Sequence, residues 1–196
     1  MKLHYMGKFN LDPDTLPQAE HRPNSVIFKE ASSMKKLAII ANGISVVICL
    51  LLAVLAFFRL RSSFNSSMIL PAYLACICTL LTAFPHEILH ALCFKKDVYM
   101  YTNLKQGMLF VTGTEDMSRG RFVFMSLLPN MIFGIVPYVL GMIFPNLIFL
   151  TVFGAICTGM GAGDYYNVFN ALTQVPRSGR VYMSGMRTYW FTPEKN

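Results

Sequence analysis

Residues 86–90 read His-Glu-Ile-Leu-His and stand at the end of a long apolar run. Two histidines four residues apart on a helix are separated by about 40° around its axis, so both imidazoles leave the same face. Two neutral imidazoles supply two corners of a zinc site, and a glutamate beside the first can serve as general base. The spacing therefore predicts Zn²⁺ bound by His86 and His90, with Glu87 activating a zinc-bound water.

A catalytic zinc needs about three protein ligands, and the best third ligand in this chain is Asp164. This carboxylate ends the last apolar block after a glycine-rich stretch, and a carboxylate at membrane depth is costly unless it is paired or metal-bound. The alternative interpretation is a water-exposed residue at a helix end. The HExxH motif on a neighbouring span favours the ligand. His4 and His21 lie in the polar N-terminal segment and are expected to be solvated.

Two asparagines are candidates for supporting the metal site or binding substrate. Asn167 follows Asp164 by three residues, so it shares a helical face with Asp164 and is a candidate donor to that carboxylate or to a substrate carbonyl. An interhelical hydrogen bond is an equally good interpretation. Asn130, which follows Pro129 inside an apolar block, is a candidate for the same role. Cys93 is expected to be a small buried apolar residue rather than a ligand.

The composition is that of a membrane protein. Of 196 residues, 54% are hydrophobic and only 14% are charged, and the mean hydropathy is +0.46. A soluble domain carries about 25% charged residues. The apolar residues form four blocks that are long enough to cross a bilayer core of about 30 Å. The predicted fold is therefore an α-helical integral membrane protein with about four transmembrane helices, at residues 37–58, 68–94, 122–144 and 147–172.

The segments outside the spans are more polar. Residues 1–34 and 173–196 are predicted to be cytoplasmic tails, on either side of a membrane-embedded core at residues 35–172. Two β-prone runs, 98–102 and 108–112, predict a short hairpin after the HExxH helix. We expect this hairpin to pack near the site and to offer a free edge that holds an extended peptide.

The net charge of +7 comes from basic residues that flank the apolar blocks, as topology signals do. We expect a multi-pass protein of the cell membrane. The positive-inside rule predicts that both of its termini lie in the cytoplasm. No Lys/Arg-rich run with interleaved aromatic residues is present, so nucleic acid is not an expected partner. The five cysteines lie in or beside apolar blocks and do not form a disulfide pattern. The oligomeric state does not follow from the sequence.

Four elements occur in a recognisable order: HEILHALCF, the following hairpin, Leu-Pro-Asn at 128–130 and Gly-Asp-Tyr-Tyr-Asn at 163–167. With them the chain resembles a family of small bacterial membrane proteins classed as zincin peptidases, distant relatives of the site-2 class of intramembrane metalloproteases. The resemblance runs from about residue 70 to 190. It implies zinc held by His86, His90 and Asp164, with Glu87 as base. In the site-2 class the third ligand stands in a Leu-Asp-Gly sequence, whereas Asp164 stands in Gly-Asp-Tyr. This difference affects what the resemblance implies about the substrate groove.

The predicted function is a membrane-embedded zinc metalloprotease that hydrolyses peptide bonds of membrane or membrane-proximal substrates, such as a peptide or a single-span protein. Two alternatives remain open: a non-catalytic accessory or assembly protein with a structural metal, and a small metal carrier. The substitution Glu87→Gln separates them. A protease would lose turnover and keep its metal, a structural site would change little, and a carrier would change metal flux.

Overall fold

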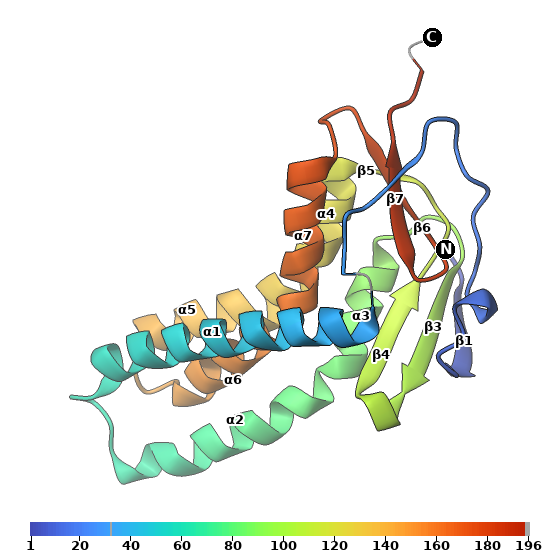
Figure 1. The fold of residues 1–196 in the computed structure, drawn as a ribbon. Coiled ribbons are helices and arrows are strands. Elements are labelled where there is room, and N and C mark those ends of the chain that lie inside the picture. The colour runs from blue at the N-terminus through green and yellow to red at the C-terminus, as the bar shows by residue number, and fades with distance from the viewer. Residues whose placement is uncertain (32, 195–196) are drawn as a thin grey trace. The chain divides into compact units, whose positions relative to one another are not determined.

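The computed structural model describes residues 1–31 and 33–194, and Figure 1 shows its elements. The chain is mostly helical and also contains two small sheets. It divides into two compact units. The sheet unit comprises Met1–Glu30, Glu87–Ser126 and Asn167–Asn196, and the helical unit comprises Ala31–His86 and Leu127–Tyr166. The chain passes from one unit to the other between His86 and Glu87, inside the HExxH motif.

The helical unit carries most of the apolar sequence. Its elements, including helices that continue into the sheet unit, are α1 (Met34–Leu60), a 3-10 turn (Ser66–Met68), α2 (Ile69–Leu81), α3 (Ala83–Leu92), α4 (Arg119–Pro129), a π-helical turn (Asn130–Ile135), α5 (Val136–Ile143), α6 (Ile148–Met160) and α7 (Ala162–Gln174). Helix α6 packs against α1, α2 and α5. A Cβ at Gly154 would collide with the backbone of Tyr138, so the glycine permits the close approach of α6 and α5.

Two helices are long and apolar enough to cross a membrane, Lys35–Leu60 and Arg119–Ile143. Two further pairs meet the same criterion together but are bent: Ser66–Leu81 with Ala83–Leu92 by 49°, and Ile148–Met160 with Ala162–Gln174 by 52°. The structure thus has two to four candidate spans, depending on whether each bent pair counts as one. The breaks fall at Thr82 and Gly161, each within four residues of a predicted zinc ligand.

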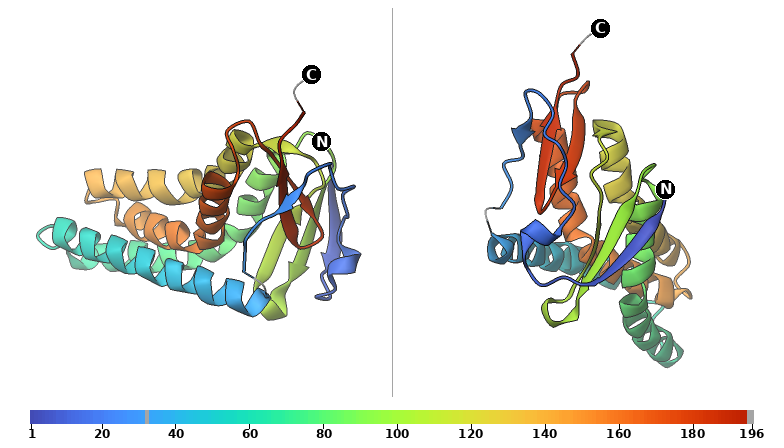
Figure 2. Two further views of the ribbon diagram at one scale, coloured as in Figure 1. Left: turned by 45° about the horizontal axis from the view of Figure 1, so that its top comes forward. Right: turned by 90° about the vertical axis from the view of Figure 1, so that its right-hand side faces the viewer.

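The hairpin predicted after the HExxH helix is confirmed. Strand β3 (Val98–Asn103) pairs antiparallel with β4 (Met108–Thr112), and a 3-10 turn (Leu104–Gln106) joins them. Gly107 closes the turn in the left-handed region, at φ 62°, where a glycine has no Cβ clash. Strand β1 (Leu3–Lys8) pairs in parallel with the other side of β3, giving the order β1-β3-β4 (Figure 2).

The second sheet has the order β2-β7-β6-β5, with β2 (Val26–Ile27), β5 (Met117–Ser118), β6 (Arg180–Ser184) and β7 (Arg187–Phe191). The N-terminal segment contains β1 and β2 with a 3-10 turn (Pro13–Thr15) between them, and the C-terminal segment contains the β6–β7 hairpin. The main core of the unit includes Ala91 of α3 and Phe94 just after it, packed with Val98, Met117, Phe122 and Val181. The end of the HExxH helix is therefore anchored in the core of the sheet unit.

Candidate metal centre

Helix α3 starts directly after the break at Thr82. The Thr82 carbonyl accepts the backbone N–H of His86 at 2.8 Å, which makes this the first hydrogen bond of the new helix. Pro85 lies in the first turn, where a missing N–H costs no intrahelical hydrogen bond. A fresh helix start therefore places His86 within one turn of the break.

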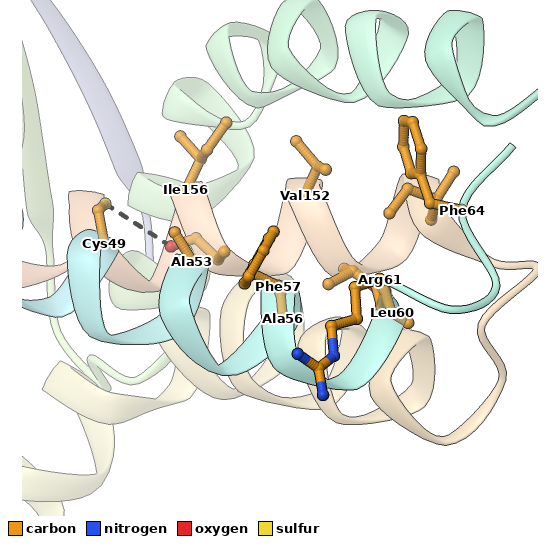
Figure 3. A pocket seen from close by; sticks show the side chains of 12 residues that line it. Cys49, Ala53, Ala56, Phe57, Leu60, Arg61, Phe64, Val152 and Ile156 are labelled. Carbon is orange, nitrogen blue, oxygen red and sulfur yellow. Dashed lines mark hydrogen bonds between the residues drawn. The ribbon is translucent and has the colours of Figure 1, made fainter. Parts of the chain in front are cut away.

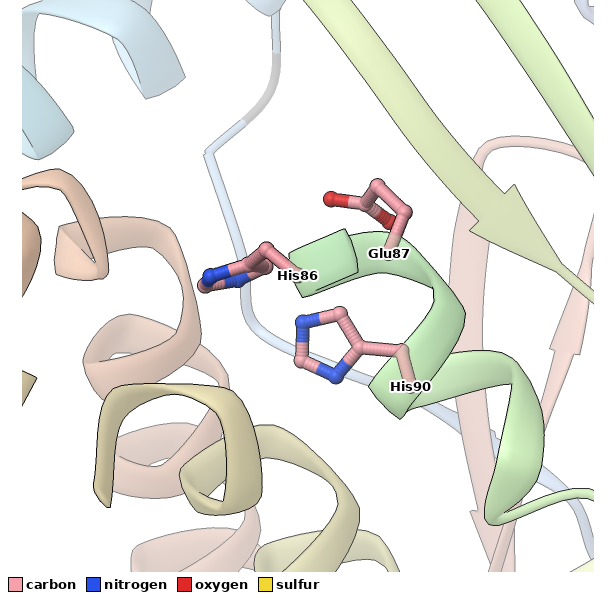
Figure 4. A group of neighbouring side chains, drawn as sticks. All are labelled: His86, Glu87 and His90. Atoms are coloured by element: carbon pink, nitrogen blue, oxygen red, sulfur yellow. The ribbon is translucent and has the colours of Figure 1, made fainter. Parts of the chain in front are cut away.

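His86, Glu87 and His90 form one group on α3. A ligand atom from each lies within 4.8 Å of those from the other two. Figure 4 shows both imidazole rings on one side of the helix, with the Glu87 carboxylate leaving beside them. Helical spacing alone produces this arrangement, because residues four apart share a face.

The His86 ring faces Asp164. The two atoms concerned, His86 Nε2 and Asp164 Oδ2, are 3.1 Å apart, and both residues belong to the helical unit. Tetrahedral zinc with ligand bonds of about 2.0–2.1 Å separates its ligand atoms by about 3.3 Å. The two atoms are at hydrogen-bond distance, which is also close to the spacing of two neighbouring zinc ligands, and an imidazole with a carboxylate is a donor set that zinc accepts.

Asn130 holds the same carboxylate. Its Nδ2 donates to Asp164 Oδ2 at 2.7 Å, and the residue is 1% exposed. Asn130 opens the π-helical turn, a feature that is frequent at functional sites. Gly161 lies against it, because a Cβ at that position would overlap the Asn130 amide. The second helix break and the π turn thus meet where Asp164 is positioned.

The His90 ring is oriented by a backbone carbonyl. His90 is 7% exposed, and its Nδ1 lies 2.9 Å from the carbonyl oxygen of Met125. A carbonyl only accepts, so Nδ1 carries the proton and Nε2 carries the lone pair that a metal-binding nitrogen needs. In helix α4 the usual donor to Met125 would be the N–H of residue 129, which is a proline and has none. Pro129 therefore leaves a carbonyl available for the histidine.

Glu87 contacts the edge of the first sheet. Its Oε2 accepts the backbone N–H of Val111, on β4, at 3.0 Å. Because backbone groups alternate along an antiparallel strand, Val111 and Leu109 direct their N–H and C=O groups away from β3. Among the described strands none pairs with this outer edge of β4. The predicted general base is thus hydrogen-bonded to an open strand edge.

The end of α3 is fixed by a buried ion pair. The carbonyl of Cys93 accepts from the Arg121 guanidinium, with Nε at 2.9 Å. Glu115, 6% exposed, accepts from Arg121 Nη1 at 2.5 Å and from the backbone N–H groups of Lys95 and Lys96 at 2.6 and 2.8 Å. Burial raises the pKa of Glu115, but these donors outweigh it and hold the pKa below its ordinary value.

The other predicted residues lie outside this group. Asn167 is half-buried on α7, and its side chain makes no hydrogen bond within the described part of the chain. The Cys93 thiol donates to the Leu89 carbonyl at 3.5 Å. His4 pairs with Asp97 at 3.5 Å, and the His21 ring lies 3.0 Å from the Tyr182 hydroxyl.

Sequence reasoning missed three supports: the Met125 carbonyl, the Val111 N–H and Gly161. The role of the Met125 carbonyl could have been predicted from the sequence. A proline four residues after a helical residue leaves the carbonyl of that residue without its usual donor.

A family model described as "Putative zincin peptidase" matches residues 79–179, which are 101 of the 196 residues. The chain belongs to this family. The matched segment contains His86, Glu87, His90, Asn130 and Asp164. Membership in a zincin family implies zinc, and it agrees with the His-Glu-His group on α3. No curated protein and no solved structure matches the chain.

Proposed function

We propose that the protein is a membrane-embedded zinc metalloprotease in which His86, His90 and Asp164 hold the metal and Glu87 is the general base. The observation that carries the proposal is the 3.1 Å separation of His86 Nε2 and Asp164 Oδ2, between residues 78 positions apart in sequence. Two supports strengthen it. The His90 tautomer puts a lone pair on Nε2, which is the form that binds a metal, and the family is a zincin family.

The chemistry divides between the metal and the glutamate. Zinc at such a site supplies Lewis acidity, which polarises a peptide carbonyl and makes water more acidic. Glu87 accepts the proton that the attacking water loses and delivers it to the amine nitrogen as the C–N bond breaks. Asn130 fixes the Asp164 carboxylate, and the Met125 carbonyl fixes the His90 ring.

The open edge of β4 is the proposed substrate-binding element. Leu109 and Val111 offer backbone donors and acceptors to an extended peptide, which would add to the sheet as another strand. Such a strand would meet the Val111 N–H, which donates to the Glu87 carboxylate in this structure. A substrate bound there lies beside the general base. Because a helix hides its peptide bonds, a transmembrane substrate must unwind locally before it pairs.

The proposed setting is the cell membrane, with both termini in the cytoplasm. The two to four candidate spans support embedding, and the basic residues that flank them support the orientation. The proposed substrates are peptides or single-span membrane proteins. The relationship to the site-2 class, which the motif order predicts, remains a prediction.

The deciding experiment measures zinc in the detergent-purified protein beside His86→Ala, Asp164→Ala and Glu87→Gln. We expect about one zinc per chain in the wild type and in Glu87→Gln, and loss in the two ligand variants. Cleavage of a model single-span substrate should disappear in Glu87→Gln. Retention of zinc in Asp164→Ala would mean that another residue is the third ligand. Unchanged cleavage by Glu87→Gln would overturn the proteolytic mechanism.

A further inference from the structure

The apolar sequence of α1 contains one exposed amide, Asn42. Its side chain forms no hydrogen bond within the described part of the chain. It lies seven residues after Lys35 in a candidate membrane span, which is about 10 Å along the helix. An amide in an apolar environment is costly unless it has a hydrogen-bond partner. The position of Asn42 therefore indicates a polar partner from outside the described chain.

Asn42 shares a face of α1 with two residues that pack on α6. Ser45 and Cys49 follow it by three and seven residues, and these intervals return to the same side of a helix. The Cys49 thiol lies 3.9 Å from the Ala155 carbonyl oxygen, at one end of the apolar groove between α1 and α6 (Figure 3). A Cβ at Gly159 would collide with the Cys49 sulfur and would lie 3.3 Å from the Ser45 hydroxyl. The side chain of Asn42 therefore leaves α1 on the side of α6.

The same contacts show which residues stand level with Asn42. Helices α1 and α6 run antiparallel, so one turn back along α1 corresponds to one turn forward along α6. Asn42 lies one turn before Ser45. Gly163 lies one turn after Gly159, so Gly163 and Asn42 stand at the same level. The chain bends by 52° here, between α6 and α7, and a Cβ at Gly163 would meet nothing within 4 Å. Open space therefore lies at this level, directly before Asp164.

A second copy of the chain does not fit the face of α1 that carries the amide. The outer face contains Val47 and Leu51, which are 57% and 60% exposed and lie about 140° and 180° around the helix from Asn42. A copy packed on that apolar face would leave the amide without a partner. A partner beside Gly163 lies next to Asp164 instead, and the side chain of Asp164 is 14% exposed.

We propose that Asn42 is a substrate-binding residue of the metal centre, and that its amide hydrogen-bonds the backbone of the unwound substrate segment beside Asp164. This inference rests on the proposed proteolytic function and adds a binding residue to it. An unwound segment in an apolar environment exposes N–H and C=O groups that need partners. A side-chain amide offers two donors and an acceptor, so Asn42 serves either group.

The first measurement is substrate affinity in Glu87→Gln, which is expected to keep its metal without turnover. The probe is a fluorescently labelled single-span peptide with a central Gly-Gly pair that unwinds readily. Adding Asn42→Leu should raise the Kd of this peptide about fivefold, the effect of losing one hydrogen bond. Asn42→Gln keeps an amide and should recover part of the affinity. Gly43→Ala is the matched control, because a Cβ there meets nothing within 4 Å, and its Kd should be unchanged.

Cross-linking tests the location independently of affinity. In the Glu87→Gln protein, Asn42→p-benzoylphenylalanine should cross-link to the peptide on illumination. Val47→p-benzoylphenylalanine, on the outer face of α1, should not. Zinc content checks that each variant is folded.

An unchanged Kd in a folded Asn42→Leu variant would overturn the binding role. Cross-linking from position 42 to a second copy or to lipid, and not to the peptide, would overturn it as well. The proposed function fails separately, when the wild type does not cleave the peptide. A weaker Kd in Asn42→Leu together with that failure would support the binding residue and refute proteolysis.

Discussion

Pro129 lies one helical turn after Met125 and leaves the Met125 carbonyl without an intrahelical donor. That carbonyl instead accepts Nδ1 of His90 at 2.9 Å. A proline inside an apolar helix usually destabilises it, because a hydrogen bond is lost. Here the lost bond provides the acceptor that fixes the tautomer of a proposed zinc ligand. The proline is therefore a positioning residue for His90.

Replacing Pro129 with alanine should weaken zinc binding. The new N–H competes for the Met125 carbonyl, so His90 is less firmly oriented, and loss of such a support typically costs 10–100-fold in metal affinity. We expect a change of about tenfold, measured by competition with a chelator. The ¹⁵N resonances of His90 should also show a mixture of tautomers.

Pro137→Ala is the control for this substitution. Pro137 opens α5 in the same helical run and lies 12 residues after Met125, so an N–H restored there does not compete for the Met125 carbonyl. Zinc affinity should be unchanged in this variant. If Pro129→Ala also bound zinc like the wild type, the orienting role of the proline would be wrong.

Gly161→Ala should damage the support of Asp164. The added methyl group overlaps the Asn130 amide, which donates to Asp164 at 2.7 Å, so either the amide or the helix must shift. Overpacking of this kind costs about 1–3 kcal/mol. We expect a lower melting temperature and a lower zinc occupancy.

Gly163→Ala offers a direct comparison, since it is two residues further on and a Cβ there meets nothing within 4 Å. It should keep its zinc and lose no stability, because alanine favours the helix by about 1 kcal/mol over glycine. Similar zinc loss in both variants would show that backbone flexibility before Asp164, and not the fit to Asn130, is what matters.

The candidate site residues differ in how far the local sequence points to them. His86, Glu87 and His90 follow from helical spacing, which is a local property of the chain. Asp164 is a candidate from the sequence because a carboxylate in an apolar block is rare, and its role as a ligand stays a prediction. The bond from Asn130 to Asp164 and the bond from Val111 to Glu87 join residues 34 and 24 positions apart, so no local pattern reveals which atoms meet.

The elements of the fold also differ in how well the local sequence predicts them. Apolar blocks predict helices well, but the bends at Thr82 and Gly161 depend on packing as well as on composition. The hairpin β3–β4 is local and predictable. Strand β1 pairs with β3 across about 95 residues, and β7 pairs with β2 across more than 160. Short strands in polar segments carry little periodic signal, so these pairings were not expected from the sequence.

Val111→Pro should reduce cleavage without loss of zinc. Proline removes the N–H that faces the open edge and Glu87, but it removes no hydrogen bond between β3 and β4. The measurement is the cleavage rate beside zinc content. Phe110→Pro is the contrasting variant, because Phe110 pairs with Tyr101 inside the hairpin, and its loss should unfold the sheet instead. Full activity in Val111→Pro would exclude β4 as the substrate-binding edge.

Acid should weaken the anchor at the end of the HExxH helix. The donors around Glu115 hold the pKa of this carboxyl below the ordinary value of 4.5, so its folded pKa lies below its unfolded pKa. The stabilisation is complete above about pH 4.5, and it is lost as the pH falls through the folded pKa. Thermal unfolding followed from pH 7 to pH 3 should therefore show falling stability below about pH 4.5.

Glu115→Gln should remove this pH dependence and cost about 2 kcal/mol at neutral pH, since Arg121 loses its charged partner. Asp116→Asn is the matched control. Burial raises the pKa of Asp116, but the Arg180 guanidinium outweighs it and lowers the pKa, and the side chain is 23% exposed, against 6% for Glu115. Its neutral-pH loss should be smaller, because exposed pairs contribute little. If the stability of Glu115→Gln fell in acid as that of the wild type does, other carboxylates would be the cause of the acid sensitivity. The Glu115–Arg121 pair would then not be the anchor of the helix end.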